Sequence, residues 1–291
     1  MNRLIKIVVP VILFVLSLSV SGCFVRPERA GESDGALGRA EERDDVSKSG
    51  YSVDTDESFR VGGLERREVY LLIGQSNMAG RAEVETGDEA VIEGCELFNA
   101  GGEWEEATNP LNRFSTIRKK ISMQRLGPGY GFAKRMRELR PDVSIGLVVN
   151  ARGGTSIQEW AKGTQYYDEA ICRARAAQSD GRLTGILWHQ GESDGKRSDS
   201  YLEKLTVLIS DLRADLGDPE LPFVAGLVEQ DDRDGKVARV INDVILQLPD
   251  AVPNTAVASS EGLLTSDGTH FDSAGQRLLG ARFADALLSL E

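Results

Sequence analysis

Short apolar runs alternate along this chain with longer stretches in which apolar residues recur every three or four positions. The runs predict β-strands at residues 69–73, 96–99, 144–150, 185–189, 223–227 and 255–258. The periodic stretches predict amphipathic helices at residues 130–140, 166–178, 200–216, 236–247 and 274–290. Pro141 and Pro249 each stand just beyond a predicted helix, where a proline acts as a stop signal.

Strands that alternate with helices predict an α/β fold with three layers, α/β/α, around a mostly parallel central sheet. Parallel strands need crossover connections, and helices in those connections cover both faces of the sheet. In open sheets of this kind, ligands bind beyond the carboxyl ends of the strands. The residues that directly follow the predicted strands are therefore where we expect a functional site.

The first 23 residues have the pattern of an export signal. Arg3 and Lys6 supply a positive start, and residues 4–20 form an apolar stretch that is short for a membrane-spanning helix. The small residues that end at Cys23 resemble a bacterial lipobox, in which the cysteine is acylated and becomes the mature N-terminus. We therefore expect residues 1–23 to be a lipoprotein-type signal peptide with Cys23 as the lipidation site. An ordinary secretory peptide with an incidental cysteine is the alternative.

Residues 24–66 are rich in Gly, Ser, Asp, Glu and Arg and have no lasting apolar period, which predicts a disordered polar tether. Residues 67–291 are then a single folded domain. Together these segments predict an exported, membrane-anchored bacterial lipoprotein that faces the periplasm or the cell surface.

The formal net charge of −12 argues against a nucleic-acid partner, because phosphate binding needs clustered Lys and Arg. The two histidines and the cysteines Cys95 and Cys172 do not have the spacing of a metal site, so we expect neither a metal nor another cofactor. Whether Cys95 and Cys172 form a disulfide stays open, since pairing cannot be read from a sequence.

Ser76 follows the predicted strand 69–73, at the point where the chain should turn into a helix. Asp267 and His270 lie three positions apart in a glycine-containing loop before the last predicted helix. A serine nucleophile needs an imidazole that takes its proton and a carboxylate that holds the imidazole in the right tautomer. We therefore predict a catalytic triad of these three residues. The alternatives are a helix N-cap serine, a loop-capping aspartate and a surface histidine.

Two further loops could stabilise a developing oxyanion. Glycines 153 and 154 follow the predicted strand 144–150 and let backbone amides approach a ligand closely, although a plain turn is the competing interpretation. Gln190 follows the strand 185–189 and could donate an amide hydrogen. The predicted oxyanion hole comprises the backbone amides of Ser76 and Gly154 and the side chain of Gln190. The residues expected to support the site are Gln75, Gly153, His189 and Glu192, with a purely structural histidine as the alternative for His189.

Taken together, these residues resemble the SGNH hydrolases, and more narrowly the family-six carbohydrate esterases and sialic acid-specific acetylesterases. Four blocks carry the resemblance in the family's order, at residues 74–78, 153–155, 188–192 and 267–271. The resemblance covers residues 68–291 and implies a flavodoxin-like SGNH fold. The asparagine that the wider superfamily has in its third block is absent, and Gln190 is the replacement that the narrower family implies.

The resemblance further implies a carbohydrate O-acetyl esterase that releases acetate through the Ser-His-Asp triad, without a metal. The favoured substrate is acetylated xylan-type polysaccharide or its oligomers. The alternative is O-acetylated sialic acid, with Arg81 and Arg152 as candidate cations for its carboxylate. A lipase-like esterase and a non-catalytic carbohydrate-binding protein are further alternatives.

Overall fold

The computed structural model describes residues 60–61, 64–65, 67–229 and 236–291. The predicted signal peptide 1–23, Cys23 and most of the predicted tether 24–66 lie outside the described residues. Within the tether range, the short strands β1 (Arg60–Val61) and β2 (Leu64–Glu65) pair antiparallel. Within the described part of the chain, no helix combines the length and the apolar character needed to cross a membrane.

A seven-stranded sheet forms the centre of the domain, with the strand order β5-β4-β6-β3-β7-β8-β9. All neighbouring strands are parallel except β5, which runs antiparallel to β4. The strands are β3 (Glu68–Gly74), β4 (Cys95–Phe98), β5 (Trp104–Glu106), β6 (Ile145–Ala151), β7 (Arg182–His189), β8 (Phe223–Gly226) and β9 (Thr255–Ala258).

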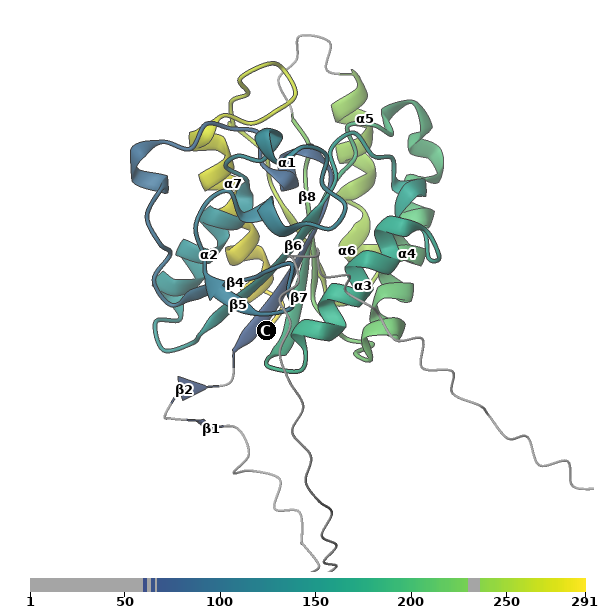
Figure 1. Cartoon of the computed structure of the whole chain (residues 1–291). Coiled ribbons are helices and arrows are strands. Elements are labelled where there is room, and N and C mark those ends of the chain that lie inside the picture. Colours follow the sequence, from purple (N-terminus) through teal and green to yellow (C-terminus); the bar gives the residue numbers. More distant parts are fainter. Residues whose placement is uncertain (1–59, 62–63, 66, 230–235) are drawn as a thin grey trace, which may run out of the picture.

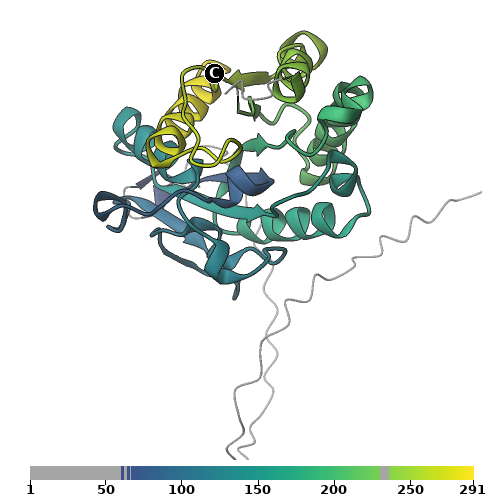
Figure 2. The same cartoon turned by 90° about the horizontal axis from the view of Figure 1, so that it is seen from above.

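Helices cover both faces of this sheet (Figures 1 and 2). They are α1 (Ser76–Ala79), α2 (Pro128–Leu139), α3 (Gln165–Ala177), α4 (Tyr201–Leu216), α5 (Lys236–Ile245), α6 (Leu248–Ala251) and α7 (Ser273–Leu288). Figure 1 shows α2 and α7 on one side of the sheet and α3 to α6 on the other. Short 3-10 turns lie in the loops, at Thr86–Asp88, Leu111–Phe114, Ile121–Met123, Ile157–Trp160 and Gly195–Ser200.

The central strand β3 shows why the core has two halves. Successive side chains of a strand point to opposite faces. Leu71 and Ile73 therefore pack into the core beneath α3 and α4, while Tyr70 and Leu72 pack into the core beneath α2 and α7. All four are fully buried, as expected for a parallel strand in the middle of a sheet covered on both faces.

The two ends of the folded domain meet at the amino edge of the sheet. Arg140, just after α2, forms ion pairs with Glu68 at the start of β3 and with Glu291 at the end of the chain. Because α7 runs back from the carboxyl edge, the chain enters and leaves the domain at the same edge.

The predicted three-layer α/β/α fold is confirmed, and each predicted strand and helix is present with ends that shift by a few residues. The strands β1, β2 and β5 were not predicted. Pro249 lies in the first turn of α6 rather than simply beyond a helix, since α5 already ends at Ile245. Cys95 is buried and free, so it has no disulfide to Cys172.

Candidate active site

The residues of the four sequence blocks meet at the carboxyl edge of the sheet. Ser76 follows β3, the glycine loop 153–154 follows β6, and residues 190–192 follow β7. Since β6 and β7 are the two neighbours of β3, their loops flank Ser76 on both sides. The loop that carries residues 267–270 leads from β9 into α7 and reaches the same place.

The nucleophile block depends on a glycine where β3 ends. Gly74 has a φ of +137°, and a Cβ atom placed on it would lie 2.2 Å from the carbonyl oxygen of His189. The next residue, Gln75, donates its backbone N–H to that same oxygen at 2.8 Å. A side chain at position 74 would therefore push β3 away from β7, and Ser76 would lose its place at the start of α1.

Ser76, His270 and Asp267 form a continuous hydrogen-bonded chain. His270 Nε2 lies 3.0 Å from Ser76 Oγ, and His270 Nδ1 lies 2.7 Å from Asp267 Oδ2. A carboxylate only accepts hydrogen bonds, so Nδ1 carries the hydrogen and Nε2 is left to accept the proton of Ser76. The structure brings these three residues together, although Ser76 and His270 are 194 positions apart in the sequence.

Asp267 is held ionised by the loop around it. Partial burial alone would raise the pKa of its carboxyl, but hydrogen bonds from the His270 ring and from the backbone N–H groups of Thr269 and His270 outweigh it. The pKa of Asp267 therefore lies below its ordinary value. An ionised carboxylate at this place can stabilise the imidazolium that forms when His270 takes a proton.

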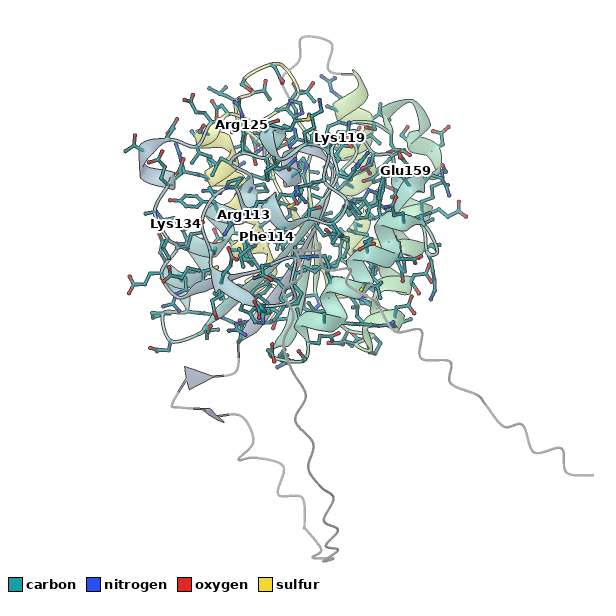
Figure 3. The ribbon with its side chains drawn as sticks, viewed as in Figure 1. Arg113, Phe114, Lys119, Arg125, Lys134 and Glu159 are labelled. Atoms are coloured by element: carbon teal, nitrogen blue, oxygen red, sulfur yellow. The ribbon has the colours of Figure 1, made fainter. Side chains whose placement is uncertain are left out.

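The glycine loop lies directly against the nucleophile. A Cβ atom on Gly153 would lie 3.3 Å from Ser76 Cβ and 2.5 Å from an Nη atom of Arg81, so a larger residue does not fit without movement. Gly154 has a φ of +77° and is exposed. Its backbone N–H makes no hydrogen bond within the described part of the chain, which leaves it available to a ligand. The amino group of Lys119 lies close by, and Figure 3 labels this side chain.

The Gln190 amide is not free to act as the predicted oxyanion donor. The residue is fully buried, and its amide nitrogen lies 2.6 Å from Asp194 Oδ2, 2.9 Å from the carbonyl oxygen of Thr155 and 3.2 Å from Gln75 Oε1. An amide nitrogen has only two hydrogens, and these buried oxygens use both. In this structure Gln190 thus anchors Gln75 and the glycine loop instead of offering a free donor to a ligand.

His189 is buried beneath the site, and among the described residues it makes no hydrogen bond to Ser76. It is fully buried, and its Nε2 lies 3.0 Å from the carbonyl oxygen of Leu227. A carbonyl only accepts, so Nε2 carries the hydrogen. Its Nδ1 lies 3.7 Å from Glu192 Oε1. The structural interpretation of His189 therefore agrees with the geometry.

Asn77 is a site residue that the sequence reasoning did not single out. It is fully buried, and its side chain contacts Glu192, Gln276 and the backbone on both sides of His270. The nucleophile block placed Asn77 beside Ser76. However, no local pattern indicates where a buried amide points when its partners lie more than a hundred residues away.

Two candidate cations for a substrate carboxylate have structural partners. Arg152 donates through Nη1 to the carbonyl oxygen of Ile117 at 2.8 Å, and Arg81 donates through Nη1 to the carbonyl oxygens of Gly80 and Met123. Both side chains therefore tie neighbouring loops together.

Among the described residues, no group of three or more His, Cys, Asp and Glu side chains could hold a metal ion.

Comparison with known proteins gives a consistent result. The family model described as "Carbohydrate esterase, sialic acid-specific acetylesterase" matches residues 66–289. The chain is 32% identical over 243 residues to the probable carbohydrate esterase At4g34215 of Arabidopsis thaliana, covering 76% of this chain and 90% of that protein.

Solved structures with the same fold include the X-ray structure of the Arabidopsis protein, with a TM-score of 0.69 and 30% identity. The alignment covers 77% of this chain and 98% of that one. NanS, at 16% identity, gives a TM-score of 0.63 over 79% of this chain and 98% of its own. XAC1771, a carbohydrate acetylesterase from Xanthomonas citri, gives 0.60 at 22% identity over 77% of this chain and 56% of its own.

Proposed function

Because the chain belongs to the carbohydrate esterase family of sialic acid-specific acetylesterases, it is an esterase, and we propose that it removes O-acetyl groups from carbohydrate through Ser76, His270 and Asp267. The observation that carries this proposal is the unbroken hydrogen-bonded chain from Ser76 Oγ through the His270 ring to Asp267. A hydroxyl is a weak nucleophile until a base takes its proton, and His270 Nε2 is placed to do so.

In the proposed reaction, Ser76 Oγ attacks the acetyl carbonyl carbon while His270 Nε2 takes the hydroxyl proton. Asp267 stabilises the imidazolium that forms. The tetrahedral intermediate then collapses, and His270 gives its proton to the oxygen of the departing sugar hydroxyl. Water, activated by His270 in the same way, hydrolyses the acetyl-enzyme and releases acetate.

The oxyanion of the tetrahedral intermediate needs hydrogen-bond donors beside Ser76. We propose the backbone N–H of Ser76, in the first turn of α1, and the backbone N–H of Gly154. N–H groups in the first turn of a helix have no partner inside that helix, and the N–H of Gly154 has none in the described residues. Donors of this kind are typically worth about 10²–10³-fold in turnover each. Gln190 supports this arrangement because its amide nitrogen donates hydrogen bonds to the Gln75 side chain and to the carbonyl oxygen of Thr155.

For the substrate, we propose acetylated xylan-type polysaccharide or its oligomers, which are largely neutral. The structural roles of Arg81 and Arg152 support a neutral substrate, because Nη1 of each guanidinium group already donates to main-chain carbonyl oxygens. O-acetylated sialic acid is the second candidate, and the exposed amino group of Lys119 beside Gly154 is the observation that favours it.

The test is acetate release, measured side by side from acetylated xylo-oligomers and from 9-O-acetylated sialic acid at equal concentration. We expect the xylo-oligomers to react faster, and the Ser76→Ala variant to release acetate from neither. Faster reaction of the sialic acid, with a loss specific to that substrate in a Lys119→Gln variant, would reverse the choice of substrate. Octanoyl esters, run in parallel, should react more slowly than acetyl esters.

We further propose that the protein is exported and held at a membrane by a lipid on Cys23. Support comes from the residue pattern of positions 1–23 alone. The acetylated carbohydrate would then be met outside the cytoplasm.

A further inference from the structure

Resting on the proposed function, we infer that Asn77 is a positioning residue. Together with Glu192, it holds the base His270 at hydrogen-bond distance from the nucleophile Ser76. Asn77 is the residue next to Ser76, and its side chain contacts the main chain immediately before and after His270. One buried amide therefore connects the element that carries the nucleophile with the loop that carries the base.

The four hydrogen bonds of Asn77 fix the orientation of its amide. Nδ2 donates to Glu192 Oε1 at 2.7 Å and to the carbonyl oxygen of Thr269 at 3.1 Å. Oδ1 accepts from the backbone N–H of Phe271 at 3.1 Å and from Gln276 Nε2 at 3.0 Å. An amide offers two hydrogens and two lone pairs, so every one is used, and turning the amide over would break all four contacts.

Glu192 makes this orientation unambiguous. A carboxylate is an acceptor only, so the nitrogen of Asn77 has to face it. The Glu192 side chain is only 10% exposed, and its second oxygen is buried without a hydrogen-bond partner among the described residues. Burying an unpartnered carboxylate oxygen costs free energy. A cost of this kind at the floor of a site is expected where the group has a functional task.

Asn77 is fully buried, which leaves no surface for a substrate to touch, so we infer that its effect on the reaction passes through His270. Residues 267–269 are exposed and His270 is half-buried, and within the described part of the chain Thr269 and His270 otherwise form hydrogen bonds with their own loop and with Ser76. Without the Asn77 contacts to Thr269 and Phe271, the His270 ring loses its fixed distance from Ser76 Oγ. Misplacement of a catalytic group by about 1 Å can cost roughly 100-fold in rate.

The experiment exchanges donor and acceptor between Asn77 and Glu192. Asn77→Asp keeps the side-chain volume, but it sets two carboxylates against each other and leaves the Thr269 oxygen without a donor. We expect kcat for acetate release to fall about 100-fold with little change in KM. Glu192→Gln still offers an oxygen to Asn77, so we expect a smaller loss. In the double variant, the new amide can donate to the new carboxylate, and we expect kcat to recover about 10-fold over Asn77→Asp alone.

Two further readouts separate positioning from general stability. The rate at which a fluorophosphonate modifies Ser76 reports nucleophile activation without sugar binding, and it should fall in parallel with kcat. Asn242→Ala is the matched control, because Asn242 is also buried and its side chain bonds, among the described residues, to the backbone of Val228 rather than to the triad. We expect that control to lower the melting temperature while kcat stays near that of the wild type.

A folded Asn77→Asp enzyme with unchanged kcat would overturn the inference. A double variant no faster than Asn77→Asp would also overturn it, as would a kcat loss of equal size in Asn242→Ala. Failure of the proposed function looks different: a Ser76→Ala variant that still releases acetate would refute the triad itself, whatever the Asn77 variants do.

Discussion

Each oxygen of Asp267 has its own task. Oδ1 accepts the backbone N–H groups of Thr269 and His270, at 3.0 and 2.8 Å, and so shapes the loop. Oδ2 accepts from the ring of His270 at 2.7 Å and so orients the base. The loop conformation and the tautomer of the base therefore depend on the same carboxylate.

The first prediction concerns the proton path. Ser76→Ala and His270→Ala should each lower turnover by about 10⁴-fold or more, because either change interrupts the transfer between them. Asp267→Asn should be similarly severe, since an amide N–H facing Nδ1 favours the wrong tautomer. Acetate release and thermal melting of the purified variants measure the effect on turnover and on fold.

His189→Ala is the informative counterpart to the His270 variant. His189 is buried and bonds to the Leu227 carbonyl, so its loss should reduce stability more than activity per folded molecule. If His189→Ala abolishes turnover while His270→Ala keeps it, the base has been assigned to the wrong histidine.

The second prediction concerns pH. The pKa of Asp267 is lower in the folded protein than its ordinary value of 3.8, so folding favours the ionised form. The stabilisation is therefore present above that value and is lost as the pH falls through the lowered pKa. Melting curves of the wild type and of Asp267→Asn should differ most near neutral pH and converge only as the pH falls below 3.8 and through the lowered pKa. A gap that widens toward acid would contradict this assignment.

At the level of elements, the loop after β6 works by close approach to α1. Gly153 leaves room for Arg81 and for Ser76, and the N–H of its neighbour Gly154 has no partner among the described residues. Strand β6 determines how far this loop extends beyond the carboxyl edge of the sheet, because Ile73 and Gly74 pair in register with Asn150 and Ala151. The sheet itself therefore fixes the distance between the nucleophile and the proposed oxyanion donor.

The third prediction tests that distance. Gly153→Ala places a methyl group 3.3 Å from Ser76 Cβ and 2.5 Å from the end of Arg81. We expect turnover to fall about 10-fold or more, by displacement of the Gly154 N–H, while the fold is kept because the arginine end can move. Gly87→Ala is the control, since a Cβ atom there meets nothing within 4 Å. Equal activity of the two variants would show that the loop tolerates the shift.

Periodicity predicted the elements of this fold because most of them are long or strongly apolar. Strand β5 escaped prediction because Trp104–Glu106 is short and largely polar, and it lies at an edge where one neighbour suffices. The positions of Ser76, Asp267 and His270 followed from their places after strands. The orientations of Gln190 and Asn77 could not be predicted, because partners such as Thr155 and Thr269 reach them only through the tertiary fold.

On the scale of the whole molecule, the fourth prediction concerns attachment. A Cys23→Ser variant should lose its lipid and leave the membrane fraction, since a lipid chain is what we propose holds the protein there. Fractionation and mass spectrometry of the mature N-terminus provide the measurement. Unprocessed protein still held by residues 4–20 would refute the lipobox interpretation.

The shared exit edge of the domain has a practical consequence for enzyme immobilisation. Glu68 and Glu291 both bind Arg140 at the amino edge of the sheet, whereas Ser76 lies at the opposite edge, beyond the seven residues of β3. A strand of that length spans roughly 23 Å. Coupling to a bead, or fusion to a second enzyme, through either end of the domain should therefore leave the active site facing the solution. The chain would not have to be circularly permuted for this purpose.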